Sequence, residues 1–159
     1  MKLEKEIGAL LRKQGWTFSV AESCTGGFVS HRITNVSGSS DYFEGGVVSY
    51  SNRAKAAHLG IPPAYLQKHG AVSSQVARKM AGGVRKAFRT TFGLSTTGVA
   101  GPAGGTKKTP VGLVFMALSD GKRSWVKKET FRGTRLQIKQ LATQRCLEFL
   151  REHLMRRIR

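Results

Sequence analysis

Apolar residues follow two different patterns along the chain, and the alternation between them predicts the order of the elements. Spacing of four residues, as in Val76, Met80, Val84 and Phe88, is typical of an amphipathic helix. Short continuous apolar runs between Gly, Ser or Pro residues are typical of buried strands. We expect helices at about 2–14, 25–33, 62–70, 73–88 and 134–155, and strands at about 16–21, 47–51, 92–97, 111–118 and 124–131.

Helices precede and follow strands throughout, and Asp120-Gly121 is a strong hairpin signal between the last two strands. This order predicts an α/β fold: a single-domain three-layer sandwich with a mixed β-sheet flanked by helices. The chain contains no repeat or linker, so one domain should span residues 1–159. We expect its basic end, residues 151–159, to fray.

Composition narrows the class of protein. Hydrophobic residues make up 40% of the 159 residues, as in an ordinary globular domain. No apolar run approaches the ~18 residues of a membrane span, and the charged amino terminus lacks a signal-peptide core. The two cysteines and four histidines show no disulfide or metal-ligand spacing. We therefore expect a cytoplasmic protein without a metal, a cofactor or a membrane anchor.

The net charge is +18 and the pI is near 10.9, both high for a small enzyme. No aspartate or glutamate occurs between Gly45 and Ser119. This basicity indicates either binding to nucleic acid or another anionic surface, or simply a solvated basic exterior. Because no nucleic-acid motif or interleaved aromatic block occurs, we expect any contact with nucleic acid to be non-specific.

The turn Ala21-Glu-Ser-Cys-Thr-Gly-Gly27 joins a predicted strand to a predicted helix. Its N–H groups could bind an oxyanion or a phosphate, which makes Ser23 a candidate nucleophile. Alternatively, Ser23 and Thr25 only cap the helix, and Gly26 and Gly27 only permit close packing. We interpret Cys24 as a small buried neighbour of Ser23 and not as the nucleophile.

Lys55 follows a predicted strand end that also carries Tyr50 and Asn52. A lysine acts as a base only when its amine is neutral, and desolvation or nearby positive charge lowers its pKa. The acid-free segment meets this requirement, although an ordinary surface lysine would explain it equally well. Tyr50, His58 and His69 are the other proton acceptors available in this segment.

A glycine-rich loop runs from Gly98 to Thr106 and is followed by Lys107-Lys108. It matches neither the Walker nor the dinucleotide pattern, yet its unhindered N–H groups suit a phosphate. The alternative interpretation is a flexible connection between strands.

Together these segments resemble the carboxy-terminal domain of the CinA family, the competence/damage-inducible proteins. The amino-terminal domain of full-length members, which resembles molybdopterin-binding proteins, is absent from this sequence. The resemblance covers nearly the whole chain, in order. The matching segments are Ala21–Gly27, Gly46–Lys55, Leu59-Gly60, Gly70–Ser73, Thr97–Thr106, Pro110–Gly112 and Phe131–Arg135.

The resemblance implies an amidase that converts nicotinamide mononucleotide to nicotinate mononucleotide and ammonia. Ser23 matches the family's nucleophile, Lys55 its partner base, and Tyr50 a tyrosine that assists proton transfer. The expected partners are a small nucleotide substrate and further copies of the chain, as a homo-oligomer. The residues expected to bind substrate are Asn52, Gly101 and two alternative phosphate sites, Thr25-Gly26-Gly27 and Gly104-Gly105-Thr106.

The helix from Ser73 departs from the family pattern, because it carries arginines where glutamates are usual. The competing hypothesis is a catalytically idle basic module that binds nucleic acid or a protein partner of the competence or damage response. A third is amidase or esterase action on another small substrate. The presence of both Ser23 and Lys55 favours an enzyme.

Overall fold

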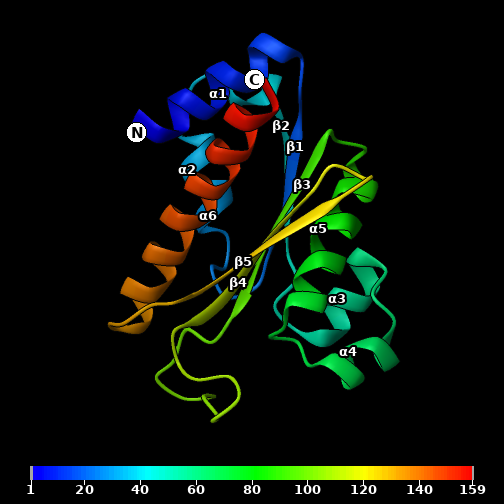
Figure 1. The fold of residues 1–159 in the computed structure, drawn as a ribbon, viewed down its shortest axis with the longest axis vertical. Coiled ribbons are helices and arrows are strands. Elements are labelled where there is room, and N and C mark those ends of the chain that lie inside the picture. The colour runs from blue at the N-terminus through cyan, green and yellow to red at the C-terminus, as the bar shows by residue number, and fades with distance from the viewer. Residues whose placement is uncertain (1, 159) are drawn as a thin grey trace.

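Five strands form one mixed sheet in the order β2-β1-β3-β4-β5 (Figure 1). The structure is a computed structural model and describes residues 2–158. β1 pairs in parallel with β2 and β3, whereas β4 is antiparallel to both β3 and β5. The strands are β1 (Phe18–Glu22), β2 (Phe43–Val48), β3 (Phe92–Gly98), β4 (Leu113–Ser119) and β5 (Ser124–Thr130).

Helices cover both faces of the sheet, so the predicted three-layer α/β sandwich is confirmed (Figure 1). One layer consists of α1 (Lys2–Gln14), α2 (Phe28–Thr34) and α6 (Arg135–Ile158). The other consists of α3 (Asn52–Leu59), α4 (Pro63–His69) and α5 (Ser74–Phe88). A short 3₁₀ helix, Ser39–Asp41, precedes β2.

The sheet separates two apolar cores. Ile7, Phe18 and Leu150 belong to the core shared by the sheet, α1 and α6. Val76 and Met80 of α5 belong to the core on the opposite face. Every residue of β1 is buried, including the polar Ser19 and Glu22, because helices cover both of its faces.

The region around Lys55 differs from the predicted one. β2 ends at Val48, so the strand expected at 47–51 lies too far along the chain. The helix α3, which the sequence analysis missed, begins at Asn52 because the Ser51 hydroxyl accepts a hydrogen bond from the N–H of Ala54 at 3.1 Å. A Cβ on Gly46 would lie 2.7 Å from the hydroxyl of Ser30, so β2 requires glycine at this position. Glycine has a low strand propensity, which weakens the strand signal in the sequence.

The basic carboxy-terminal segment is helical as far as the structure describes it, since α6 continues to Ile158. Arg159 lies outside the described residues, and fraying of this end stays a prediction. None of the helices within residues 2–158 combines the length and apolar character needed to cross a membrane.

The two helical layers differ in their acidic residues and ion pairs. Every ion pair found within residues 2–158 has at least one partner in α1 or α6. Helices α3, α4 and α5 contain no acidic residue. Their basic residues other than Lys55 are Arg53, Lys68, Arg78, Lys79, Arg85 and Lys86.

Candidate active site

The candidate site lies where the carboxyl ends of the three parallel strands meet. Ser23 follows β1, Ser49 follows β2, and Gly98 ends β3. β1 lies between β2 and β3, so the chain leaves β1 toward one neighbour and returns on its other side. In open α/β sheets such a reversal of strand order creates a crevice at the carboxyl ends, where ligands bind.

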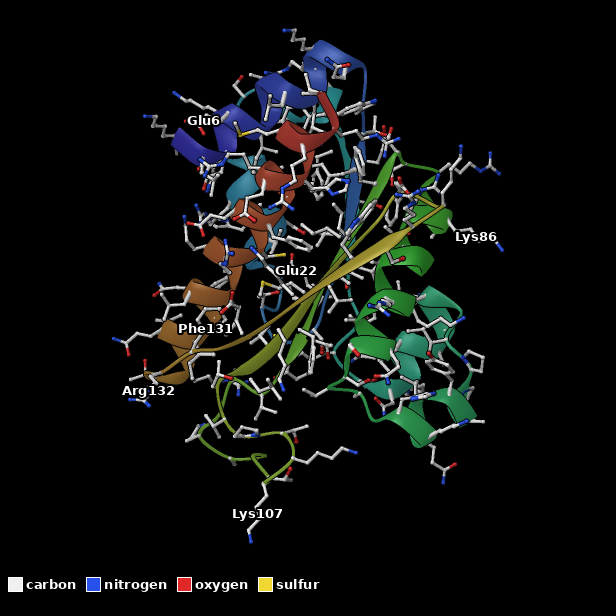
Figure 2. The ribbon with its side chains drawn as sticks, in the orientation of Figure 1. Glu6, Glu22, Lys86, Lys107, Phe131 and Arg132 are labelled. Atoms are coloured by element: carbon white, nitrogen blue, oxygen red, sulfur yellow. The ribbon has the colours of Figure 1, made fainter. Side chains whose placement is uncertain are left out.

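The buried carboxylate of Glu22 fixes the turn that carries Ser23. It accepts hydrogen bonds from the Thr25 hydroxyl at 2.6 Å, from the N–H groups of Gly27, Val29 and Ser30 at 3.0, 3.1 and 2.9 Å, and from the Ser30 hydroxyl at 2.8 Å. Figure 2 shows Glu22 in the interior of the molecule. These five donors solvate the charge and clamp the turn onto the start of α2.

Lys55 meets Ser23 at this edge of the sheet. Its Nζ lies 3.0 Å from the Ser23 Oγ, 2.8 Å from the Ser49 carbonyl oxygen and 3.5 Å from the Tyr50 carbonyl oxygen. Lys55 is 2% exposed and Ser23 is 8% exposed. The first turn of α3 thus delivers a lysine amine to a buried serine hydroxyl.

Burial lowers the pKa of the Lys55 amine from its ordinary 10.5, while Cys24 pulls it in the opposite direction. No carboxylate within residues 2–158 forms an ion pair with Lys55. A neutral amine has two hydrogens and one lone pair. The carbonyls of Ser49 and Tyr50 can take the two hydrogens, which leaves the lone pair for the proton of Ser23.

A cavity of about 270 Å³ opens beside this pair. It lies between α3, the end of β3, the glycine-rich loop and the start of α6. The expected site residues that line it are Ser23, Tyr50, Asn52, Lys55, Gly101 and Gly104. The structure therefore brings together six site residues that are far apart in the sequence.

The other expected substrate-binding residues do not line this cavity. The Thr25 hydroxyl and the Gly27 N–H both donate to Glu22, and the Gly26 N–H donates to the Ser23 carbonyl. The Thr25 hydroxyl and the N–H groups of Gly26 and Gly27 are thus engaged within the turn, so the structure adds no support for a phosphate site on Thr25-Gly26-Gly27.

The second proposed phosphate site is only partly at the cavity. Gly104 lines it, whereas Gly105 and Thr106 do not. The Thr106 hydroxyl is 2.9 Å from the Thr109 hydroxyl and closes the tip of the loop. Lys107 projects from this tip, away from the sheet (Figure 2).

Arg135 is the site residue that the sequence analysis did not single out. It lines the cavity and donates to the Gly101 carbonyl at 2.6 Å and to the Tyr50 hydroxyl at 2.5 Å. Arg135 is the last residue of Phe131–Arg135, a segment that matches the CinA family, but no local sequence pattern indicates that it binds a ligand. Tyr50 is 58% exposed, and its hydroxyl contacts Arg135 and neither member of the Ser23–Lys55 pair.

Cys24 lines the cavity but is 5% exposed. Burial raises the pKa of its thiol to about 12, so the thiolate nucleophile does not form near neutral pH. His58 and His69, the alternative bases, do not line the cavity. Residues 2–158 contain no group of three or more His, Cys, Asp or Glu that could hold a metal ion.

Sequence comparison identifies a family for this chain. The model of the CinA C-terminal domain matches residues 1–154. A CinA-like protein of Syntrophus aciditrophicus is 48% identical over 153 residues, which are 96% of this chain and 36% of that protein. A CinA-like protein of Syntrophomonas wolfei is 49% identical over 148 residues, 93% of this chain and 36% of that protein. The chain thus spans about 36% of the length of these relatives.

Solved structures agree with this assignment. The competence damage-inducible protein A of Klebsiella pneumoniae superposes with a TM-score of 0.93 at 29% identity, over 97% of this chain and 96% of that one. The competence/damage inducible protein CihA of Agrobacterium tumefaciens superposes with a TM-score of 0.90 at 35% identity, over 94% of this chain and 92% of that one. The chain therefore belongs to the CinA C-terminal domain family.

Proposed function

We propose that the protein is an amidohydrolase that converts nicotinamide mononucleotide to nicotinate mononucleotide and ammonia. The observation that carries the proposal is the 3.0 Å contact between the amine of Lys55 and the hydroxyl of Ser23, with both side chains buried. The cavity of about 270 Å³ suits a small molecule and not a polymer. The choice of this substrate rests on the family resemblance.

In the first step, Ser23 Oγ attacks the carboxamide carbon while neutral Lys55 takes the hydroxyl proton. The carbonyl oxygen becomes an oxyanion. Gly101 and Gly104 line the cavity, and neither N–H donates a hydrogen bond within residues 2–158, so both are available to the oxyanion. Lys55 then returns the proton to the leaving nitrogen, and ammonia departs from a Ser23 ester.

In the second step, water hydrolyses the ester. Lys55, neutral again, takes a proton from the water as it attacks the acyl carbon. The same amine then protonates Ser23 Oγ as the acid product leaves. No other residue is needed to carry a proton, which agrees with the lack of a carboxylate along the cavity wall.

Arg135 is assigned to the substrate phosphate. A guanidinium binds phosphate through paired N–H donors, and this one already lies at the cavity wall, held by Gly101 and Tyr50. In this scheme Tyr50 orients Arg135 and does not transfer a proton.

The proposal also concerns the setting of the reaction. The substrate is an intracellular nucleotide, so we place the protein in the cytoplasm, in the recycling of pyridine nucleotides. The reaction as written requires no cofactor. Assembly into a homo-oligomer stays a prediction.

Ammonia release by the purified protein tests the function. Nicotinamide mononucleotide is the substrate, nicotinamide and glutamine are the controls, and Ser23→Ala is the matched variant. We expect release from the mononucleotide alone and its loss in the variant. Equal release by Ser23→Ala, or none from the mononucleotide, would contradict the proposal.

The acid-free layer α3–α5 supports a second candidate, a basic module that binds nucleic acid. Binding through this layer should be independent of sequence and should weaken steeply with salt, since it releases counterions. Titration of two unrelated DNA duplexes at several salt concentrations tests it. Binding of both duplexes with similar affinity and a steep salt dependence would support this second function, and no binding at low salt would exclude it.

A further inference from the structure

A second cavity lies at the opposite end of the sheet from Ser23. It opens between the β4–β5 turn and the last turns of α6 and has a volume of about 490 Å³. Ser119, at the end of β4, pairs with Gly93, near the amino end of β3. In Figure 1 the β4–β5 turn and the end of α6 lie in the upper half, far from the glycine-rich loop at the bottom.

Aromatic rings form one wall of this second cavity. The rings of Trp125 and His153 lie 4.1 Å apart between centroids, with Phe149 beside them. The His153 Nε2 is buried and has no hydrogen-bond partner within residues 2–158. The wall therefore offers aromatic rings on which a planar ligand can stack.

The acidic side chains of the second cavity are already neutralised. Asp120 accepts hydrogen bonds from two N–H groups of its own turn and pairs with Arg157 at 2.8 Å. Glu152 pairs with Lys127 and with Arg145, each at 2.8 Å. These contacts neutralise the two carboxylates, both of which line the cavity.

The remaining basic side chains are free to meet an anion. Lys122, Arg123 and Arg156 line the second cavity and form no ion pair within residues 2–158. The second cavity thus combines aromatic rings with cations that form no ion pair within residues 2–158. A ligand that complements both must carry a planar ring and a negative charge.

We propose that this second cavity binds a nucleotide, with its base stacked on Trp125 and its phosphates on Arg123 and Arg156. Stacking and charge-assisted hydrogen bonds are the two interactions that recognise such a ligand. The volume lies within the range of about 300–1,000 Å³ common for small-ligand sites. Because the second cavity is remote from Ser23, this site is independent of the proposed amidase activity.

Fluorescence provides a direct test. The chain has two tryptophans, so Trp16→Phe leaves Trp125 as the only one. ADP is the probe, and adenosine and pyrophosphate are its two halves. We expect ADP to quench Trp125 saturably and each half to bind at least about tenfold more weakly. Isothermal titration of the unmodified protein with the same three compounds covers the case in which Trp16→Phe fails to fold.

Matched charge reversals complete the test. Arg123→Glu with Arg156→Glu should weaken ADP binding at least about tenfold. Arg78→Glu with Lys79→Glu changes the charge equally on α5 and should leave binding unchanged. Absence of saturable ADP binding, pyrophosphate binding as tight as ADP, or equal loss in both double variants would each overturn the proposal.

Discussion

The amine of Lys55 lies 3.0 Å from the hydroxyl of Ser23, although Ser23 follows β1 and Lys55 lies in the first turn of α3. Glu22 fixes the Ser23 turn through five hydrogen bonds, and the cap at Ser51 sets the first turn of α3. Neither partner could reach the other without the parallel pairing of β1 and β2. The parallel pairing of β1 and β2 therefore brings Ser23 and Lys55 together.

Lys55→Arg should abolish nearly as much activity as Ser23→Ala. Arginine keeps the positive charge, but a guanidinium does not deprotonate in proteins and cannot act as a base. We expect each variant to lose about three or more orders of magnitude in kcat, with the double variant little worse. Steady-state kinetics checks this, with circular dichroism as the folding control. Retention of most turnover in Lys55→Arg would exclude Lys55 as the base.

Amidase activity should rise with pH and then level off. Burial lowers the pKa of Lys55, and only the neutral amine accepts the Ser23 proton. Below that pKa, kcat/KM should fall by about tenfold per pH unit. A pH profile of kcat/KM for the unmodified protein measures it, and activity that falls as the pH rises from acid to neutral would contradict the assignment.

Lys55→Met should remove a pH-dependent part of the stability. Because the folded-state pKa of Lys55 is below its ordinary 10.5, the unfolded chain binds more protons in the interval between the two values. The free energy of unfolding of the unmodified protein therefore rises with pH in this interval. The variant lacks this contribution from Lys55. Thermal unfolding of both proteins at a series of pH values checks the difference. Identical slopes would show that the pKa of Lys55 is not lowered.

Arg135→Met should raise KM for nicotinamide mononucleotide by about tenfold to about a hundredfold, since a hydrogen bond to a charged group is worth about 1.5–3 kcal/mol. Arg132→Met, at an exposed arginine three residues earlier that does not line the cavity, is the control (Figure 2). The same kinetics with nicotinamide riboside, which lacks the phosphate, identifies the contact. If its KM rises equally, Arg135 does not bind the phosphate.

Glu22→Gln should destabilise the fold by about 3 kcal/mol, because the amide NH₂ replaces an oxygen that accepts from surrounding donors. Amidase activity should fall as well, since the Ser23 turn loses its anchor. Urea unfolding measures the change. Glu44→Gln, at an exposed residue of β2, should stay within about 0.5 kcal/mol. Similar midpoints for the two variants would contradict the role of Glu22.

The sequence alone was sufficient to predict the three-layer arrangement and most of the helices and strands. Helices such as α5 carry strong local periodicity and strands such as β4 carry a continuous apolar run, and tertiary contacts reinforce both. The Ser23 turn and Lys55 could also be singled out, because a glycine-rich turn and an acid-free segment are visible without coordinates. β2 was misplaced, since Gly45 and Gly46 weaken the strand signal there, and α3 was missed.

Tertiary structure decided which groups are free to act. The N–H of Gly27 looked available to a phosphate, yet Glu22 uses it, whereas Arg135 enters the cavity from the far end of the chain. Sequence patterns report local propensity and burial, because these depend on neighbouring residues. Hydrogen-bond partners and desolvation depend on residues that only folding brings together. The lowered pKa of Lys55 and the contact of Arg135 with Tyr50 could therefore be found only from the structure.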